Sequence, residues 1–159
     1  MTIASIDNIE LSSQFIDNHK PIVLRCPFQN CRTRIIPYSN KLQFVEIKSA
    51  PNCVEISRYS SESDSTPATP ELSADSKKFY QVNDVWDFDN IGVSRPSKEL
   101  LQREPIVAAN DEHIEIERLL ICSECEKGPL GFAGILKGSE KDHTNLQYFL
   151  GRDSVLYDY

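Results

Sequence analysis

Two short cysteine motifs decide the fold of this chain: Cys26-Pro27-Phe28-Gln29-Asn30-Cys31 and Cys122-Ser123-Glu124-Cys125. Each pair follows an apolar run typical of a β-strand, and turn-forming residues come after it. A structural zinc site needs four soft ligands in a tetrahedron, and a tight turn can bring two thiolates to one ion. The pattern therefore predicts one structural zinc ion that joins two hairpins and is bound by Cys26, Cys31, Cys122 and Cys125.

Two other interpretations of these cysteines stay open on the sequence. They can be two unrelated pairs of buried thiols. Alternatively, Cys122 and Cys125 can act as a redox pair, although they do not open a helix in a βαβ pattern as a thioredoxin-like motif does. Cys53 stands apart from both pairs, and we expect it to be a plain thiol outside the metal site.

Length and charge limit the class of protein. The sequence has 159 residues, 40% of them hydrophobic, and a formal net charge of −7, which predicts a single domain over 1–159. An acidic surface repels phosphate backbones, so nucleic-acid binding is disfavoured. The N-terminal residues lack the pattern of a secretory signal, and no apolar run reaches the ~20 residues of a membrane span. We expect a cytoplasmic protein without direct membrane insertion, in which cysteines stay reduced.

The apolar residues lie mostly in short runs that alternate and are rich in β-branched side chains. This pattern predicts a mostly β domain with strands at 21–26, 34–38, 41–48, 79–82, 113–121, 131–136 and 146–150. The stretch 57–76 is rich in serine, threonine and proline and cannot bury enough apolar surface to offset its ordering entropy. We expect it to be a long, disordered loop inside the domain.

One segment interleaves three carboxylates with two aromatic side chains, and we call it the acidic-aromatic segment: Asp84-Val85-Trp86-Asp87-Phe88-Asp89-Asn90. As a strand it would place Trp86 and Phe88 on the same face. One interpretation is a strand or turn whose aromatics fill the core while the aspartates face water. The other is a binding edge, because aromatics are typical interface anchors and carboxylates supply charge complementarity.

These motifs together resemble one family. The stretches are Val82-Asn83-Asp84-Val85-Trp86-Asp87-Phe88-Asp89-Asn90-Ile91-Gly92-Val93-Ser94 and Leu120-Ile121-Cys122-Ser123-Glu124-Cys125-Glu126-Lys127-Gly128-Pro129-Leu130-Gly131. They are similar to the zinc-containing Rab exchange factors, known as the mammalian suppressor of Sec and its yeast counterpart, the dominant suppressor of Sec. The wide spacing from Cys26 to Cys31, followed by Arg34-Ile35-Ile36, is similar to yeast-type members. The resemblance covers 22–48, 79–95 and 118–150.

The resemblance implies a fold of several coiled antiparallel β-sheets pinned by one zinc ion. It implies a guanine nucleotide exchange factor and chaperone that binds nucleotide-free Rab GTPases and promotes GDP release in vesicular transport. We further expect a monomer that associates with membranes through the Rab. The implied partner-binding residues are Asp84, Val85, Trp86, Asp87, Phe88, Asp89, Asn90 and Glu124. Glu124 lies inside the second cysteine motif, so it can serve either the partner or the metal site.

Three rival functions remain open. A methionine sulfoxide reductase of the B type has a related zinc-pinned fold but needs a nucleophilic cysteine beyond the second motif, and no cysteine follows Cys125. A zinc-ribbon nucleic-acid module would need clustered basic and aromatic residues, which this acidic chain does not show. The third rival is a zinc-stabilised module that binds a protein other than a Rab.

Overall fold

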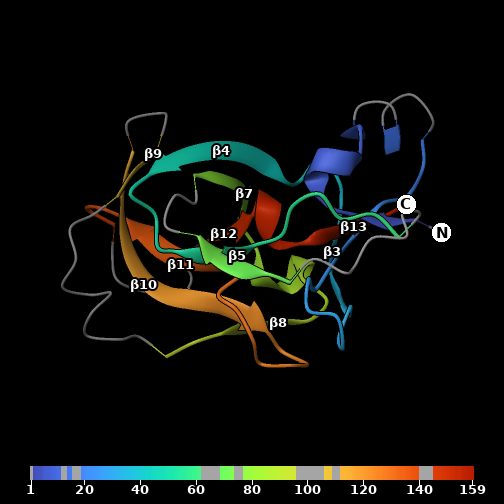
Figure 1. Cartoon of the computed structure of the whole chain (residues 1–159). Helices are drawn as coiled ribbons and strands as arrows, with labels where there is room; N and C mark the ends of the chain where they lie inside the picture. The colour runs from blue at the N-terminus through green and yellow to red at the C-terminus, as the bar shows by residue number, and fades with distance from the viewer. Residues whose placement is uncertain are drawn as a thin grey trace.

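The computed structural model of the chain describes residues 2–11, 14–15, 19–61, 69–73, 77–95, 106–108, 112–139 and 145–159. Within them the chain forms short strands and single 3-10 turns (Figure 1). In chain order these are β1 (Ile3–Ala4), η1 (Ile6–Asn8), β2 (Val23–Arg25), β3 (Arg34–Pro37), β4 (Gln43–Lys48), β5 (Cys53–Glu55), β6 (Glu71–Ser73), β7 (Lys78–Val82), η3 (Val85–Asp87), β8 (Ile91–Val93), β9 (Ile106–Ala108), β10 (His113–Cys122), β11 (Gly131–Leu136), β12 (Gln147–Gly151), η5 (Arg152–Ser154) and β13 (Leu156–Asp158).

Six strands close into an antiparallel ring in the order β10-β11-β12-β7-β4-β9, because β9 pairs back with β10. Strand β8 extends this sheet at the far end of β10, where Ile91 lies opposite Cys122. A second sheet has the order β1-β13-β2-β3, and β5 pairs with β6 in a separate two-stranded sheet. The predicted mostly β fold with several antiparallel sheets is thus confirmed.

Successive side chains of a strand point to opposite faces, so the ring strands contribute to two separate parts of the core. Phe79 and Phe149 belong to one buried cluster, together with Phe132, whose ring stacks on Phe149 at 4.9 Å between centroids. Their neighbours Tyr80 and Leu150 point the other way, into a larger cluster that includes the apolar residues of β2 and β3. The ring and the four-stranded sheet therefore share one continuous hydrophobic interface.

Each strand that the sequence predicts has a counterpart among the observed strands. The long disordered loop predicted at 57–76 needs a correction, because Glu71–Ser73 within it forms β6 and pairs with Cys53–Glu55. Residues 57–61 are also described, and Ser61 N donates to the carbonyl of Ile3 at 2.8 Å. The rest of the predicted loop, 62–68 and 74–76, lies outside the described residues.

Among the residues that the structure describes, no helix is long and apolar enough to cross a membrane.

The ring can be tested at Gly131, where β11 and β12 approach most closely. A Cβ atom there would lie 1.9 Å from the carbonyl oxygen of Phe149, which is backbone and cannot move aside. We expect Gly131→Ala to lower the free energy of unfolding by about 3 kcal/mol, at the upper end of overpacking effects. Urea denaturation measures the change. Gly92→Ala is the control, since its Cβ would meet the side chain of Ile121 at 3.1 Å and backbone only at 3.7 Å, an ordinary contact distance; an equal loss in both variants would contradict the close approach.

Candidate metal centre and acidic-aromatic segment

The four predicted cysteines converge on one point between the two main sheets. Cys26 follows β2 in the four-stranded sheet, and Cys122 ends β10 in the ring. Cys31 and Cys125 close the two turns. All four sulfur atoms lie within 4.8 Å of one another, with Cys26 and Cys122 buried and Cys31 and Cys125 partly buried. Two segments about ninety residues apart are thus brought together by their thiols.

The distances within this cluster fit one tetrahedral ion. Thiolates that bind a divalent ion at about 2.3 Å in a tetrahedron are separated by roughly 3.8 Å. The Sγ atoms of Cys26 and Cys125 lie 3.7 Å apart, and those of Cys31 and Cys122 also lie 3.7 Å apart. Each of these contacts joins one cysteine motif to the other. The cluster can therefore hold one metal ion shared by both motifs.

Backbone N–H groups of the turns point at the sulfurs, and in metal sites such hydrogen bonds orient the ligands. Burial raises the pKa of the Cys26 and Cys122 thiols, while backbone N–H donors oppose the rise, from Phe28 at Cys26 and from Cys125 and Glu124 at Cys122. At Cys31 burial acts in the same direction but is outweighed by the N–H of Thr33 and by neighbouring thiols, so its pKa is lowered. A bound cation would stabilise the thiolate form of these crowded cysteines, because it takes the place of their protons.

Further contacts hold the two motifs together around the cluster. The ammonium of Lys127, beyond the second motif, lies 5.4 Å from the ring centroid of Phe28 in the first. Within the motifs, Cys26 N donates to Thr33 O at 2.9 Å and Glu126 N donates to Cys122 O at 2.9 Å. Each turn is thus closed by its own backbone, and the cation–π contact adds an attraction between them.

Cys53 lies outside the cluster, as the sequence predicts. It is fully buried in β5, and its thiol donates to the carbonyl of Pro51 at 3.4 Å. Burial, with a smaller contribution from Glu55, raises its pKa to about 12, so the thiol is protonated at neutral pH. A protonated, buried thiol is a poor nucleophile, which argues against the reductase alternative.

The acidic-aromatic segment forms a 3-10 turn rather than a strand. Asp84 caps this turn, η3, by accepting a hydrogen bond from Trp86 N at 2.9 Å. Phe88 leaves the turn into the core, where it is 8% exposed and contacts the Tyr148 ring edge-on. Trp86 points outward and is 88% exposed. The two aromatics that a strand would place on one face therefore do different things: one anchors the segment and the other is presented to solvent.

Two aspartates of the segment form ion pairs that sequence reasoning missed. Asp87 lies 3.5 Å from Lys41, and Asp89 lies 3.4 Å from Arg34. These side chains are partly or largely exposed, so each pair contributes at most about 1 kcal/mol to stability. The partners are some fifty residues away along the chain, and no local pattern marks them. The surface around Trp86 is therefore less acidic than the segment's composition indicates.

The other predicted partner-binding residues lie close to the metal centre. Asn90 is half-buried and donates its side-chain amide to Arg34 O at 2.9 Å, and Ser123 N donates to Asn90 O at 3.4 Å. Val85 is half-buried and packs against the larger core cluster. Glu124 is exposed, and it is its backbone N–H that bonds the sulfur of Cys122. Glu124 thus belongs to the Cys122–Cys125 turn, which the end of the segment contacts through Asn90.

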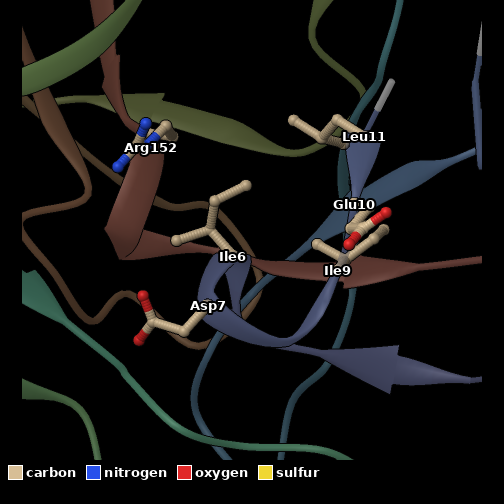
Figure 2. Close-up of a pocket in the computed structure, with 6 residues that line it drawn as sticks. All are labelled: Ile6, Asp7, Ile9, Glu10, Leu11 and Arg152. Atoms are coloured by element: carbon tan, nitrogen blue, oxygen red, sulfur yellow. The ribbon is translucent and has the colours of Figure 1, made fainter. Parts of the chain in front are cut away.

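A hollow elsewhere on the molecule shares none of the predicted site residues. Figure 2 shows it between the N-terminal segment and η5, with a volume of about 480 Å³ and a lining of Ile6, Asp7, Ile9, Glu10, Leu11 and Arg152. Two of its charged groups already have intramolecular partners. Asp7 accepts from Arg58 N at 3.3 Å, and Arg152 pairs with Asp153 at 3.4 Å. The hollow is therefore a weaker candidate for a functional site than the metal centre and its exposed tryptophan.

The fold and the cysteine cluster define a mostly β protein in which four clustered cysteines from two sheets can hold one metal ion. Comparison with known proteins agrees. A sequence model of the Mss4 protein family matches residues 6–155, so the chain belongs to the Mss4 family. It is 34% identical over 97 residues to Protein DSS4 of Saccharomyces cerevisiae. That match covers 55% of this chain and 65% of the yeast protein, and thus spans less than two thirds of the relative's length.

The metal centre is tested by matched cysteine variants. We expect Cys31→Ser to lose the bound metal, because a hydroxyl is a far poorer ligand than a thiolate. Cys53→Ser should keep one ion per chain, although it replaces a more deeply buried cysteine than Cys31. Inductively coupled plasma mass spectrometry of protein purified without chelator measures the metal content. Retention of a full ion in Cys31→Ser, or its loss in Cys53→Ser, would contradict the assignment.

Proposed function

We propose that this chain binds one structural zinc ion and acts as an exchange factor and chaperone for Rab-type GTPases, holding them in the nucleotide-free state. The observation that carries the proposal is Trp86, the sole tryptophan, which is 88% exposed on a capped turn four residues before Asn90, whose carbonyl accepts from Ser123 N in the second cysteine motif. Large exposed aromatics are common anchors of protein interfaces. Membership of the Mss4 family and the likeness to yeast DSS4 support a Rab as the protein that meets this anchor.

Zinc is the ion that best suits the centre. Four thiolates without oxygen or nitrogen ligands select zinc or iron–sulfur chemistry over the harder cations. A closed site with four protein ligands supplies no open position for substrate, which is the arrangement of structural rather than catalytic zinc. The ion's role is then to hold the fold, and the protein regulates a GTPase rather than catalysing a reaction of its own.

Exchange follows from thermodynamic linkage. A protein that binds an empty GTPase more tightly than the loaded one must weaken nucleotide affinity by the same factor. Every 1.4 kcal/mol of this preference corresponds to about tenfold in nucleotide affinity. In this proposal Trp86 supplies apolar contact with the switch region of the GTPase, and the aspartates of the segment oppose the phosphate-bound arrangement. Asp87 and Asp89 would take part only after their ion pairs with Lys41 and Arg34 break and each pairs with a basic group of the partner instead.

Glu124 is the carboxylate best placed to meet the partner directly. Its side chain is exposed, and in the part of the chain that the structure describes it makes no hydrogen bond or ion pair of its own. Glu124 contacts the sulfur of Cys122 through its backbone N–H, which any residue except proline could supply. We infer that the carboxylate contributes charge complementarity to a basic region of the GTPase. The protein would act as a cytoplasmic monomer and reach membranes through the Rab.

The proposed function is tested by the release of a fluorescent GDP analogue from a panel of purified Rab proteins. We expect the protein to accelerate release from at least one Rab, and Trp86→Ala to reduce the acceleration at least tenfold, as loss of an interface anchor does. Phe44→Ala is the matched control, because Phe44 is another exposed aromatic, 48% exposed on β4, outside the segment. If no Rab responds to folded, metal-loaded protein, the Rab assignment is wrong and a different protein partner is indicated.

A charge variant tests the electrostatic part. Glu124→Lys should slow association with the responsive Rab and weaken its dependence on salt, because rim charges act mainly on association rates. Stopped-flow binding at several ionic strengths measures both. Glu46→Lys, the same exchange at an exposed position on β4, should leave the rate within about twofold. Equal association rates for the wild type and Glu124→Lys would exclude a contact between Glu124 and the partner.

A further inference from the structure

Asn90 occupies the junction between the acidic-aromatic segment and both cysteine motifs. Its side-chain amide donates to Arg34 O at 2.9 Å and to Thr33 Oγ1 at 3.3 Å. Its backbone carbonyl accepts from Ser123 N at 3.4 Å. Residues 33 and 34 leave the first motif, and Ser123 lies inside the second. A single residue therefore joins the end of the segment to both halves of the metal centre.

The groups that Asn90 contacts are themselves tied to the cysteines. Thr33 O accepts from Cys26 N at 2.9 Å, and the Thr33 N–H bonds the sulfur of Cys31. Ser123 follows Cys122 directly, and Ile91, next to Asn90, lies opposite Cys122 in the β8–β10 pair. The position of Asn90 is thus set by the same backbone that positions three of the four thiols, those of Cys26, Cys31 and Cys122.

Between Trp86 and Asn90 the segment has further attachments to the rest of the protein. Phe88 anchors the middle in the core, and Asp89 N donates to Ile35 O at 2.7 Å. The ion pairs of Asp87 and Asp89 are exposed and weak. Trp86 itself is 88% exposed, so core packing does not fix its direction.

We propose that Asn90 is a positioning residue, which orients Trp86 from the metal centre and does not itself contact the partner. Its amide satisfies the Arg34 carbonyl, which Asn90→Ala would leave without this donor. The segment would then sample several orientations, of which a fraction presents Trp86 as the partner requires. The role in partner binding rests on the proposed function, whereas the effect on the order of Trp86 does not.

The experiment uses Trp86 as its own reporter, because it is the only tryptophan in the chain. Time-resolved fluorescence anisotropy of metal-loaded Asn90→Ala should show a larger amplitude of nanosecond motion at Trp86 than the wild type. Asn90→Asp, nearly isosteric but without the amide donor, should behave like the alanine variant. Asn52→Ala, at an exposed asparagine outside the segment, should match the wild type. Metal content should stay at one ion per chain in all three.

The binding readout separates positioning from direct contact. If the competent orientation falls to about a tenth of the population, the half-saturating concentration in GDP release rises about tenfold while the maximal rate is unchanged. Unchanged anisotropy in both Asn90 variants would overturn the proposal, and so would loss of the metal from both, which would make Asn90 part of the metal site itself. If no Rab responds to the wild type, the proposed function fails, and the anisotropy still decides the role of Asn90.

Discussion

Four sulfur atoms from two motifs that lie 91 to 99 residues apart meet within 4.8 Å, and the rest of the structure depends on this convergence. It attaches β2 and β3 of the small sheet to the end of β10 in the ring. The hydrophobic interface between the two sheets is assembled from short strands, several of only three residues, which alone could not exclude alternative registers. An ion that closes so long a loop makes its largest contribution by restricting the unfolded chain.

The surface beside the metal centre follows from this arrangement. The acidic-aromatic segment reaches both cysteine motifs through Asn90 at its end, buries Phe88 and leaves Trp86 outside. A rigid aromatic offered on a short capped turn loses little conformational freedom on binding, which favours affinity. The ion pairs with Lys41 and Arg34 offset two of the three carboxylates of the segment. Such a surface favours a partner with an apolar groove bordered by basic groups.

Much of the fold could be predicted from local pattern, and the failures have physical reasons. Alternation located the long strands, and cysteine spacing identified the four thiols that cluster. Strand β13 was missed because its Asp158 reads as a surface residue, whereas Arg25 pairs with it at 2.7 Å and allows its burial. The direction of Trp86 was not predictable from a two-residue period, because a 3-10 turn places residues i and i+2 on different sides. Strand β6 lies in a serine-rich stretch whose pairing with β5 is a tertiary effect.

The central claim is that one ion is bound by all four of these cysteines. X-ray absorption at the zinc edge, on protein purified without chelator or added metal, tests it most directly. The account predicts a first shell of four sulfur atoms at about 2.3 Å. A shell that contains nitrogen or oxygen, or fewer than four sulfurs, would contradict it, because the two motifs would then not be joined by a single closed thiolate site.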